Sequence, residues 1–323
     1  MIRYILKRVS LIIPMLLGIS ILTILIMHLA PGDPTSIRYG LNPEVSDSAR
    51  AHLKEIYDLD KPIMVQYARW LKRIVTLDFG RSFIDNRPVI EKIKERLPAT
   101  LLLQISALLL IFTIALPVGI LSAIKQNSAF DKITTFLVFI GFAMPTFWLA
   151  LLLMWFFGFQ LEWFPVSGMR PWHVLFLSGG EKIIDLLWHL VLPVVTLAFT
   201  GLAGISRYTR SSMLEVIRQD YIRTARAKGL PENKIIYKHA LKNALLPILT
   251  ILGLTLPALI SGSFIFETIF AWPGMGRLGY TAIMQYDYPT VMGVGLIATF
   301  LTLFGILISD ILYAVVDPRI RYE

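Results

Sequence analysis

The sequence contains no cysteine and few charged residues or histidines. Of its 323 residues, 16% are charged and 55% are hydrophobic, and the mean hydropathy is +0.65. The absence of cysteine excludes disulfide scaffolds, cysteine nucleophiles and zinc sites built on thiolates. The five histidines include no pair three or four residues apart, which disfavours a metal centre; they are His28, His52, His173, His189 and His239. So little charge is typical of a chain that lies in lipid.

Six apolar runs are long enough to cross a hydrocarbon core about 30 Å thick, which takes roughly 20 helical residues. They cover residues 11–30, 99–124, 133–159, 186–206, 244–266 and 289–316. Backbone amides in lipid must be paired within the protein, and runs of this length favour helices over a closed barrel. The first run follows basic residues, as a signal peptide would, but it is longer than a signal core and lacks a small-x-small cleavage site. We therefore expect a retained first span and an all-α integral membrane protein with six spans.

The charge distribution predicts the orientation in the membrane. A net charge of +9 could indicate nucleic-acid binding or the basic cytoplasmic rim of a membrane protein. With the N-terminus inside, the cytoplasmic segments hold sixteen Lys and Arg, whereas the two short outer loops hold three. The remaining twelve lie in the long segment 31–98, whose charge has little influence on orientation. We expect both termini to be cytoplasmic and no nucleic-acid partner.

The outer segment 31–98 contains two apolar stripes at helical spacing. The first predicts an amphipathic helix from about Pro62 to Leu77; it consists of Ile63, Tyr67, Trp70, Leu71 and Ile74. The second precedes Pro98 and consists of Val89, Ile90, Ile93 and Leu97. Such helices could cover the outer mouth of the bundle or receive an extracytoplasmic partner, and periodicity leaves both interpretations open.

The inner segment 207–243 is strongly basic and contains a predicted helix, corner and second helix. A short helix is expected from Asp220 to Lys228 and a left-handed Gly229 at its end, and Pro231 suits the start of the next helix. Ala225 and Gly229 are four residues apart, so they can share a small-residue face that another protein approaches closely. The alternative is a basic loop that touches lipid head groups.

Other polar signals are weaker. The run 274–279 matches G-x-G-x-x-G, but no buried strand precedes it, so we expect a turn with Trp272 at head-group depth rather than a nucleotide site. No G-x-x-x-x-G-K-[ST] occurs, so the chain has no P-loop of its own for ATP. Asp310 lies inside the sixth run toward the cytoplasm, where it has either a structural partner or water, or a role with substrate or protons. Glu267, at the outer end of the fifth run, is a candidate for contact with a substrate amino group.

Two functions of membrane proteins, proton-driven transport and intramembrane proteolysis, fit the residues poorly. A proton-driven transporter usually has several facing intramembrane ionisable groups or related halves, whereas Asp310 stands alone. An intramembrane protease would need a catalytic pair or metal group at matching depth. The serines Ser122, Ser206 and Ser261 have no convincing partner in the sequence. A third class is a permease without catalysis of its own that is driven by a separate ATPase. A test of whether transport requires ATP would separate this class from the other two.

The stretch DYIRTARAKG at 220–229, followed by HALKNALLP at 239–247, resembles the coupling loop of ABC-importer permeases. Only Ala225 and Gly229 are kept from the general Glu-Ala-Ala-x-x-x-Gly form, which argues against the sugar and amino-acid branches. The stretch is similar to the branch that serves dipeptides, oligopeptides, glutathione and nickel. That likeness extends along the chain through APGDP at 30–34, LDFGRS at 77–82, LPATLLL from 97, MPTFWLALLL from 144, WPGMGRLG at 272–279 and DPRIRY from 317.

The resemblance implies a six-span type I ABC-importer permease that forms half of the translocation pathway and is not itself an enzyme. Its expected partners are a homologous second permease, two cytoplasmic ATPases that bind ATP and Mg, and an extracytoplasmic binding protein. It implies a multi-pass location in a bacterial cytoplasmic membrane and no cofactor on this chain. Peptides are the expected substrates, with glutathione and nickel complexes left open. The residues expected to couple to an ATPase are Asp220, Tyr221, Arg223, Thr224, Ala225, Arg226, Gly229, His239 and Asn243.

Overall fold

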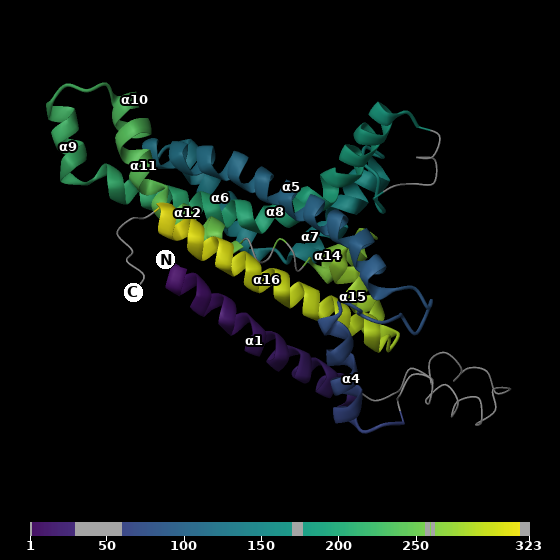
Figure 1. Cartoon of the computed structure of the whole chain (residues 1–323). Coiled ribbons are helices and arrows are strands. Elements are labelled where there is room, and N and C mark those ends of the chain that lie inside the picture. Colours follow the sequence, from purple (N-terminus) through teal and green to yellow (C-terminus); the bar gives the residue numbers. More distant parts are fainter. Residues whose placement is uncertain (1, 30–59, 170–176, 256–258, 260–261, 317–323) are drawn as a thin grey trace.

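The computed structural model describes residues 2–29, 60–169, 177–255, 259 and 262–316. Every regular element in these residues is a helix, and the one β contact is an isolated bridge between Arg81 and Pro88. Long helices run along a bundle, and shorter helices lie at its ends (Figure 1). Four helices are long and apolar enough to cross a membrane, or six if each of two bent pairs is one span. The expected all-α membrane protein is confirmed, with four to six candidate spans.

The described helices follow one another along the whole chain. In chain order they are α1 (Ile2–Leu29), α4 (Ile63–Val75), α5 (Val89–Ile124), α6 (Ala129–Ala143), α7 (Thr146–Leu153), the π-helix η1 (Met154–Gln160), α8 (Gly179–Ile217), α9 (Asp220–Ala227), α10 (Glu232–Lys234), the π-helix η3 (Ile235–Ala240), α11 (Leu241–Ala244), α12 (Leu246–Thr255), α14 (Phe264–Ile269), α15 (Met275–Met284) and α16 (Tyr288–Val316).

Two of the long helices extend well beyond the apolar runs that predicted them. The run at 99–124 ends where α5 ends, but α5 begins at Val89, so the second stripe of the outer segment is its first part. Helix α8 begins at a capping box in which Ser178 and Glu181 each accept from the other's backbone N–H. It then continues past the run at 186–206 into the basic inner segment. An apolar run therefore marks the part of a helix in lipid rather than its ends.

The expected span at 133–159 is bent in the structure, and whether it crosses the membrane stays a prediction. Helices α6 and α7 meet at an angle of 104° between Ala143 and Thr146. Pro145 has no backbone N–H and disfavours the helical conformation of the residue before it. Met144 accordingly adopts an extended backbone, with φ −84° and ψ 121°. The pair is therefore a broken span or a re-entrant segment.

The run at 244–266 is also interrupted. The helical segment Glu232–Ala244 meets α12 at 45°. Gly262 then has a φ of +68° and Ser263 is extended, so α14 begins as a separate short helix at Phe264. Residues 256–258 and 260–261 lie outside the described residues, as do 31–59 of the outer segment and the expected cytoplasmic C-terminus at 317–323.

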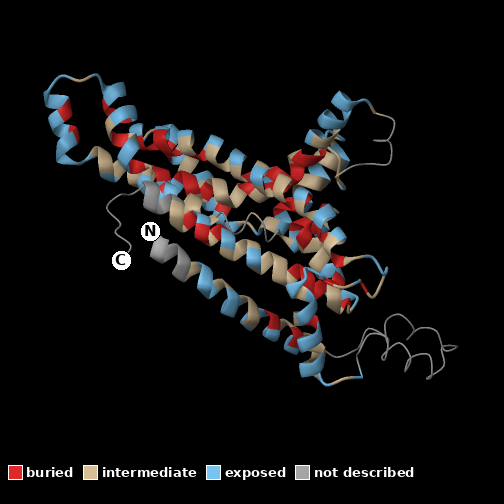
Figure 2. Cartoon of the chain, in the orientation of Figure 1, coloured by how far each residue is buried: buried red, intermediate tan, exposed pale blue. Residues whose placement is uncertain are grey.

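Helices α5 and α8 form the centre of the bundle and pack along each other. A Cβ atom on Gly119 of α5 would lie 2.5 Å from the Cβ of Thr209 on α8, so the backbones approach closely, as small residues allow in membrane helices. Helix α6 packs on α8, and α16 packs on α15, α12 and α1. Buried residues concentrate between these helices, whereas α1 is largely exposed (Figure 2).

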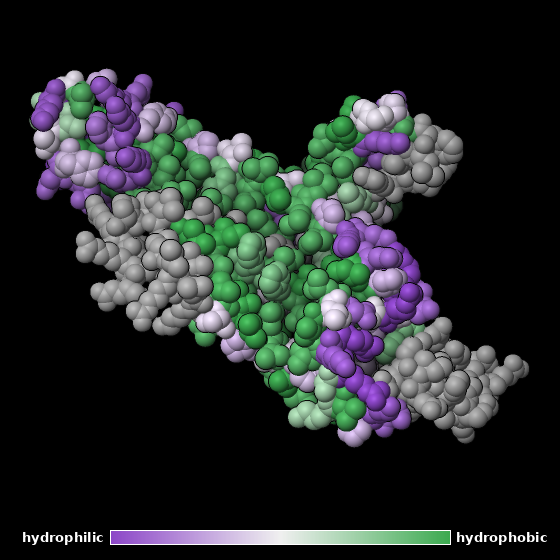
Figure 3. Space-filling view, viewed as in Figure 1, coloured by the Kyte–Doolittle hydropathy of each residue, from purple (hydrophilic) through white to green (hydrophobic). Residues whose placement is uncertain are grey.

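The surface of the bundle suits lipid. Large apolar side chains are exposed along its helices, among them Ile26 at 65% and Phe136 at 64%. In water such a surface would aggregate, whereas in hydrocarbon it has no cost. Hydrophilic residues gather at the two ends, one carrying α9 and α10 and the other carrying the outer loops (Figure 3). This pattern supports a chain that crosses a bilayer along the bundle axis.

Candidate functional site

Helix α9 and the corner after it form the structure that the basic inner segment predicted. Gly229 has a φ of +73°, the left-handed conformation expected for it. Its N–H donates to the carbonyl of Arg226 at 2.9 Å, and the N–H of Leu230 donates to the carbonyl of Ala225 at 3.4 Å. These two bonds make a Schellman motif, which pairs carbonyls that the helix end leaves free. The next helical segment begins after Pro231.

Helix α9 packs mainly on η3 and shares a buried cluster with α5 and α8. Ile222 is fully buried, in a cluster with Ile120 of α5, Met213 of α8 and Ile235 of η3. Ala225 belongs to the same cluster and is only 8% exposed. Ala225 therefore packs within this chain, and the close approach of another protein to Ala225 and Gly229 stays a prediction.

The other expected coupling residues gather around this corner. Arg226 binds Glu232 through two hydrogen bonds of 2.7 and 3.2 Å, and the guanidinium lowers the pKa of the Glu232 carboxyl below its ordinary value. The Nδ2 of Asn243 donates to the Tyr221 hydroxyl at 2.7 Å and so ties α11 to α9. The remaining members lie on the same two helical segments: Arg223 pairs with Asp220 at 3.4 Å, Thr224 donates to the Asp220 carbonyl at 3.0 Å, and His239 lies half-buried in η3.

The sequence did not predict a buried ion pair near the end of the bundle that carries α9. Asp131, at the start of α6, is 3% exposed and accepts from Nε and Nη2 of Arg210 on α8 at 2.6 and 2.9 Å. It also accepts from the hydroxyl of Ser122 on α5 and from the N–H of Asn127. One carboxylate therefore joins three helices, and because its partner is far away in sequence, no local pattern predicts the pair.

Glu267 is fully buried at the opposite end of the bundle. Its carboxylate accepts from the hydroxyl of Thr100 at 3.0 Å and from the N–H of Arg277 at 2.8 Å. Arg277 lies in the first turn of α15, where backbone N–H groups have no partner within the helix. Glu267 accepts a hydrogen bond from one of these groups, and its negative charge interacts favourably with the positive end of the helix dipole. Burial raises the pKa of this carboxyl. These contacts give Glu267 a structural role in this conformation, and contact with a substrate amino group stays a prediction.

The G-x-G-x-x-G run is shaped around that carboxylate. A Cβ atom on Gly274 would lie 2.3 Å from the carboxyl carbon of Glu267, so only glycine fits there. Trp272 is fully buried and its Nε1 donates to the carbonyl of Ala99 at 2.8 Å. The indole thus anchors this turn to the start of the second apolar run, and the expected place of Trp272 at head-group depth stays a prediction.

Asp310 lies on α16 and forms an ion pair with Arg8 of α1 at 3.1 Å. The two side chains are 23% and 42% exposed. The pair gives the intramembrane carboxylate a structural partner, which is one of the two roles considered for it. A role in transport stays untested.

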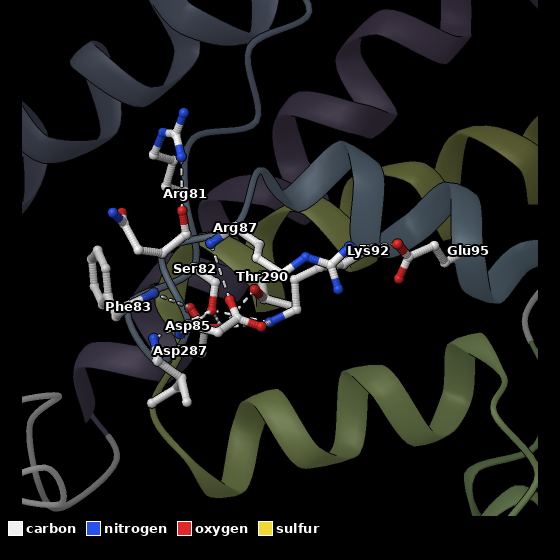
Figure 4. Close-up of polar contacts among 11 residues, drawn as sticks. Arg81, Ser82, Phe83, Asp85, Arg87, Lys92, Glu95, Asp287 and Thr290 are labelled. Carbon is white, nitrogen blue, oxygen red and sulfur yellow. Dashed lines mark hydrogen bonds and ion pairs between the residues drawn. The ribbon is translucent and has the colours of Figure 1, made fainter. Parts of the chain in front are cut away.

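A second polar network joins the outer loop to the start of α16 (Figure 4). Asp287 is 1% exposed and accepts from the hydroxyl of Ser82 at 2.5 Å, the N–H of Phe83 at 2.9 Å and the hydroxyl of Thr290 at 2.6 Å. Lys92 of α5 pairs with Asp85 at 3.0 Å and lies 3.6 Å from Asp287. The segment LDFGRS at 77–82 and the segment DYP at 287–289 are therefore two sides of one contact.

The predicted outer amphipathic helix is present as α4. Trp70 is 7% exposed and packs with Ile24 of α1 and Met292 of α16. The Tyr67 and Ser20 hydroxyls lie 2.9 Å apart. The apolar stripe thus covers the outer ends of two long helices. Among the described residues no group of three or more His, Asp or Glu could hold a metal.

Comparison with known proteins places the chain in a family. Residues 115–322 match the model of the binding-protein-dependent transport system inner membrane component, and residues 1–104 match the N-terminal model of such membrane components. The chain is 46% identical to the oligopeptide transport system permease protein AppB of Bacillus subtilis over 323 residues, the full length of both. It is 42% and 39% identical to the dipeptide transport system permease proteins DppB of Alkalihalophilus pseudofirmus and Escherichia coli K12, again over both full lengths. The chain therefore belongs to the family of binding-protein-dependent transport system inner membrane components.

Proposed function

We propose that this chain is the permease subunit of an ATP-driven importer of small peptides and lines half of the path across the cytoplasmic membrane. Full-length identity to oligopeptide and dipeptide permeases supports the substrate class. The observation that supports coupling is the buried cluster that joins Ile222 and Ala225 of α9, through η3, to α5 and α8. A force applied to α9 would reach both central helices through this cluster, because packed interiors transmit strain.

The proposal includes partners and a topology. A homologous second permease, two ATPases that bind ATP and Mg, and an extracytoplasmic binding protein would complete the transporter. Six spans follow if each bent pair crosses once, and both termini are then cytoplasmic. The sixteen basic residues of the inner segments support this orientation.

Uptake by the complete transporter tests the function. The chain, its companion permease, the ATPases and the binding protein would be reconstituted in vesicles and supplied with labelled di- and oligopeptides, glutathione or a nickel complex. We expect peptide uptake that requires ATP and is unaffected by collapse of the proton gradient. Uptake driven by the proton gradient without ATP would refute the proposed class, and uptake of glutathione or nickel alone would refute the substrate.

Topology can be tested directly because the chain has no cysteine of its own. Asn233→Cys should react with a membrane-impermeant maleimide only in inverted vesicles, whereas Asn86→Cys and Gly180→Cys should react in intact cells. Reaction of Asn233→Cys from outside would contradict the proposed orientation.

A further inference from the structure

Near the inner ends of α5, α6 and α8 lies a hollow of about 280 Å³ that the proposed transport function does not use. Three helices contribute to it: α5 through Val118, Gly119 and Ser122, α6 through Thr134, Thr135, Val138 and Phe139, and α8 through Ser206, Arg207, Arg210 and Ser211.

The polar groups of the hollow divide into a set that is hydrogen-bonded within the chain and a set that is half-buried or exposed. Arg210 is held by the two oxygens of Asp131, so its charge is balanced within the chain. Three other lining side chains form no hydrogen bond or ion pair with any described residue, although all three can donate; they are Thr135, Arg207 and Ser211. The two arginines and Asp131 together leave one net positive charge, and Arg207 carries it.

That charge and these donors match a phosphate diester. A diester carries one negative charge, and its two free oxygens suit the parallel N–H donors of a guanidinium. A hydroxyl donor such as Thr135 can complete the contact.

The walls of the hollow favour a lipid as the source of the phosphate. Val118, Val138 and Phe139 give it an apolar side. On α6, Phe136 and Phe139 are 64% and 61% exposed, and together they form a surface on which an acyl chain can lie. Basic pockets between membrane helices at the cytoplasmic boundary are suited to anionic head groups. We propose that this hollow binds the phosphate of an anionic phospholipid through Arg207 and Thr135.

Native mass spectrometry of the purified, delipidated transporter tests the site by titration with phosphatidylglycerol and, separately, phosphatidylcholine. We expect Arg207→Gln to weaken phosphatidylglycerol binding about tenfold or more, the size of a lost hydrogen bond to a charged group. Thr135→Val should weaken it a few-fold. Lys132→Gln is the matched control, because Lys132 is an exposed base on α6 outside the hollow, and it should change binding less than about twofold. All three variants should unfold at the wild-type temperature, since the three side chains make no internal polar contact.

Three results would overturn the proposal. Equal phosphatidylglycerol binding by wild type and Arg207→Gln would remove Arg207 from any phosphate site. Displacement of the lipid by soluble glycerol phosphate at similar concentration would assign the contact to a soluble ester rather than to the membrane. Loss of the companion permease from Arg207→Gln, with lipid binding unchanged, would identify the surface as a protein interface. None of these readouts depends on peptide transport, so the lipid site and the transport function can fail independently.

Discussion

Replacing Gly229 by valine separates the backbone conformation of the coupling corner from its surface. No described atom beyond its chain neighbours lies within 4 Å of the place where a Cβ atom would be. A side chain there meets no obstacle within this chain. The cost of the substitution therefore comes from the φ of +73° alone.

The size of this cost follows from the two conformations open to the variant. A valine that keeps the left-handed backbone costs about 1–2 kcal/mol, and a β-branched residue lies at the high end. A valine that leaves it gives up the 2.9 and 3.4 Å Schellman bonds, each with a net contribution of about 1 kcal/mol. Either way the native corner becomes less populated by a factor of about 5–30. Gly229→Asn should cost less, because asparagine tolerates the left-handed region.

The assay compares peptide uptake and ATPase co-purification for Gly229→Val, Gly229→Asn and Ala227→Val. Ala227 is exposed in the last turn of α9, so its variant adds the same bulk without positive φ. We expect Gly229→Val to insert normally but to lose ATPase retention and uptake, with the other two variants close to wild type. Full transport by Gly229→Val would refute the corner's role in coupling. Equal losses for valine and asparagine, or for Ala227→Val, would show that surface contact rather than backbone conformation matters.

Three further predictions concern the other polar contacts. Arg210→Met leaves the Asp131 carboxylate buried without its cation and should destabilise the purified protein by about 3–5 kcal/mol in thermal unfolding. The Asp131→Leu/Arg210→Met double variant should recover most of this loss. Equal stability of the single variant and the wild type would contradict the pairing. Gly274→Ala should abolish folding of the outer turn, seen as proteolysis between α14 and α15, because its Cβ would meet the Glu267 carboxylate; Gly295→Ala, with open space around it, is the control and should resist protease like wild type. Because the pKa of Glu232 is lowered, its pair with Arg226 contributes stability above pH 4.5, the ordinary pKa value, and loses it as the pH falls below that value. The difference in unfolding free energy between wild type and Glu232→Gln, at most about 1 kcal/mol for so exposed a pair, should therefore vanish in acid. A difference that grows in acid would refute the assignment.

Local sequence patterns predicted local structure well. The stripe through Tyr67 and Trp70 predicted α4, whose packing its spacing implied. The glycine at 229 and the proline at 231 predicted the helix end and the next start, because each residue type has a particular backbone preference. The last apolar run predicted α16 to within one residue, since no proline or cap interrupts it.

Contacts between distant residues could not be predicted in this way. Composition gives Glu267 and Trp272 their chemistry but not their neighbours, so the sequence predicts neither the contact of Glu267 with the start of α15 nor the hydrogen bond from Trp272 to Ala99. Asp131 and Arg210 each look like an ordinary charge at a helix end until the fold brings them together. The bend at Pro145 was visible as a proline, but an apolar run does not reveal whether a proline kinks a helix or breaks it.

Helix α1 contacts the rest of the described chain mainly through α16 and α4. Its inner part pairs with α16 through Arg8 and Asp310, and Ile24 near its outer end packs with Trp70. Among the described helices α16 is synthesised about 260 residues after α1, so α1 is in the bilayer for most of the translation of this segment before its main partner exists. The exposed apolar side chains of α1 allow this without cost. The contact between α1 and α16 therefore forms late in insertion, and a chain truncated before α16 should leave α1 free to diffuse away in the membrane.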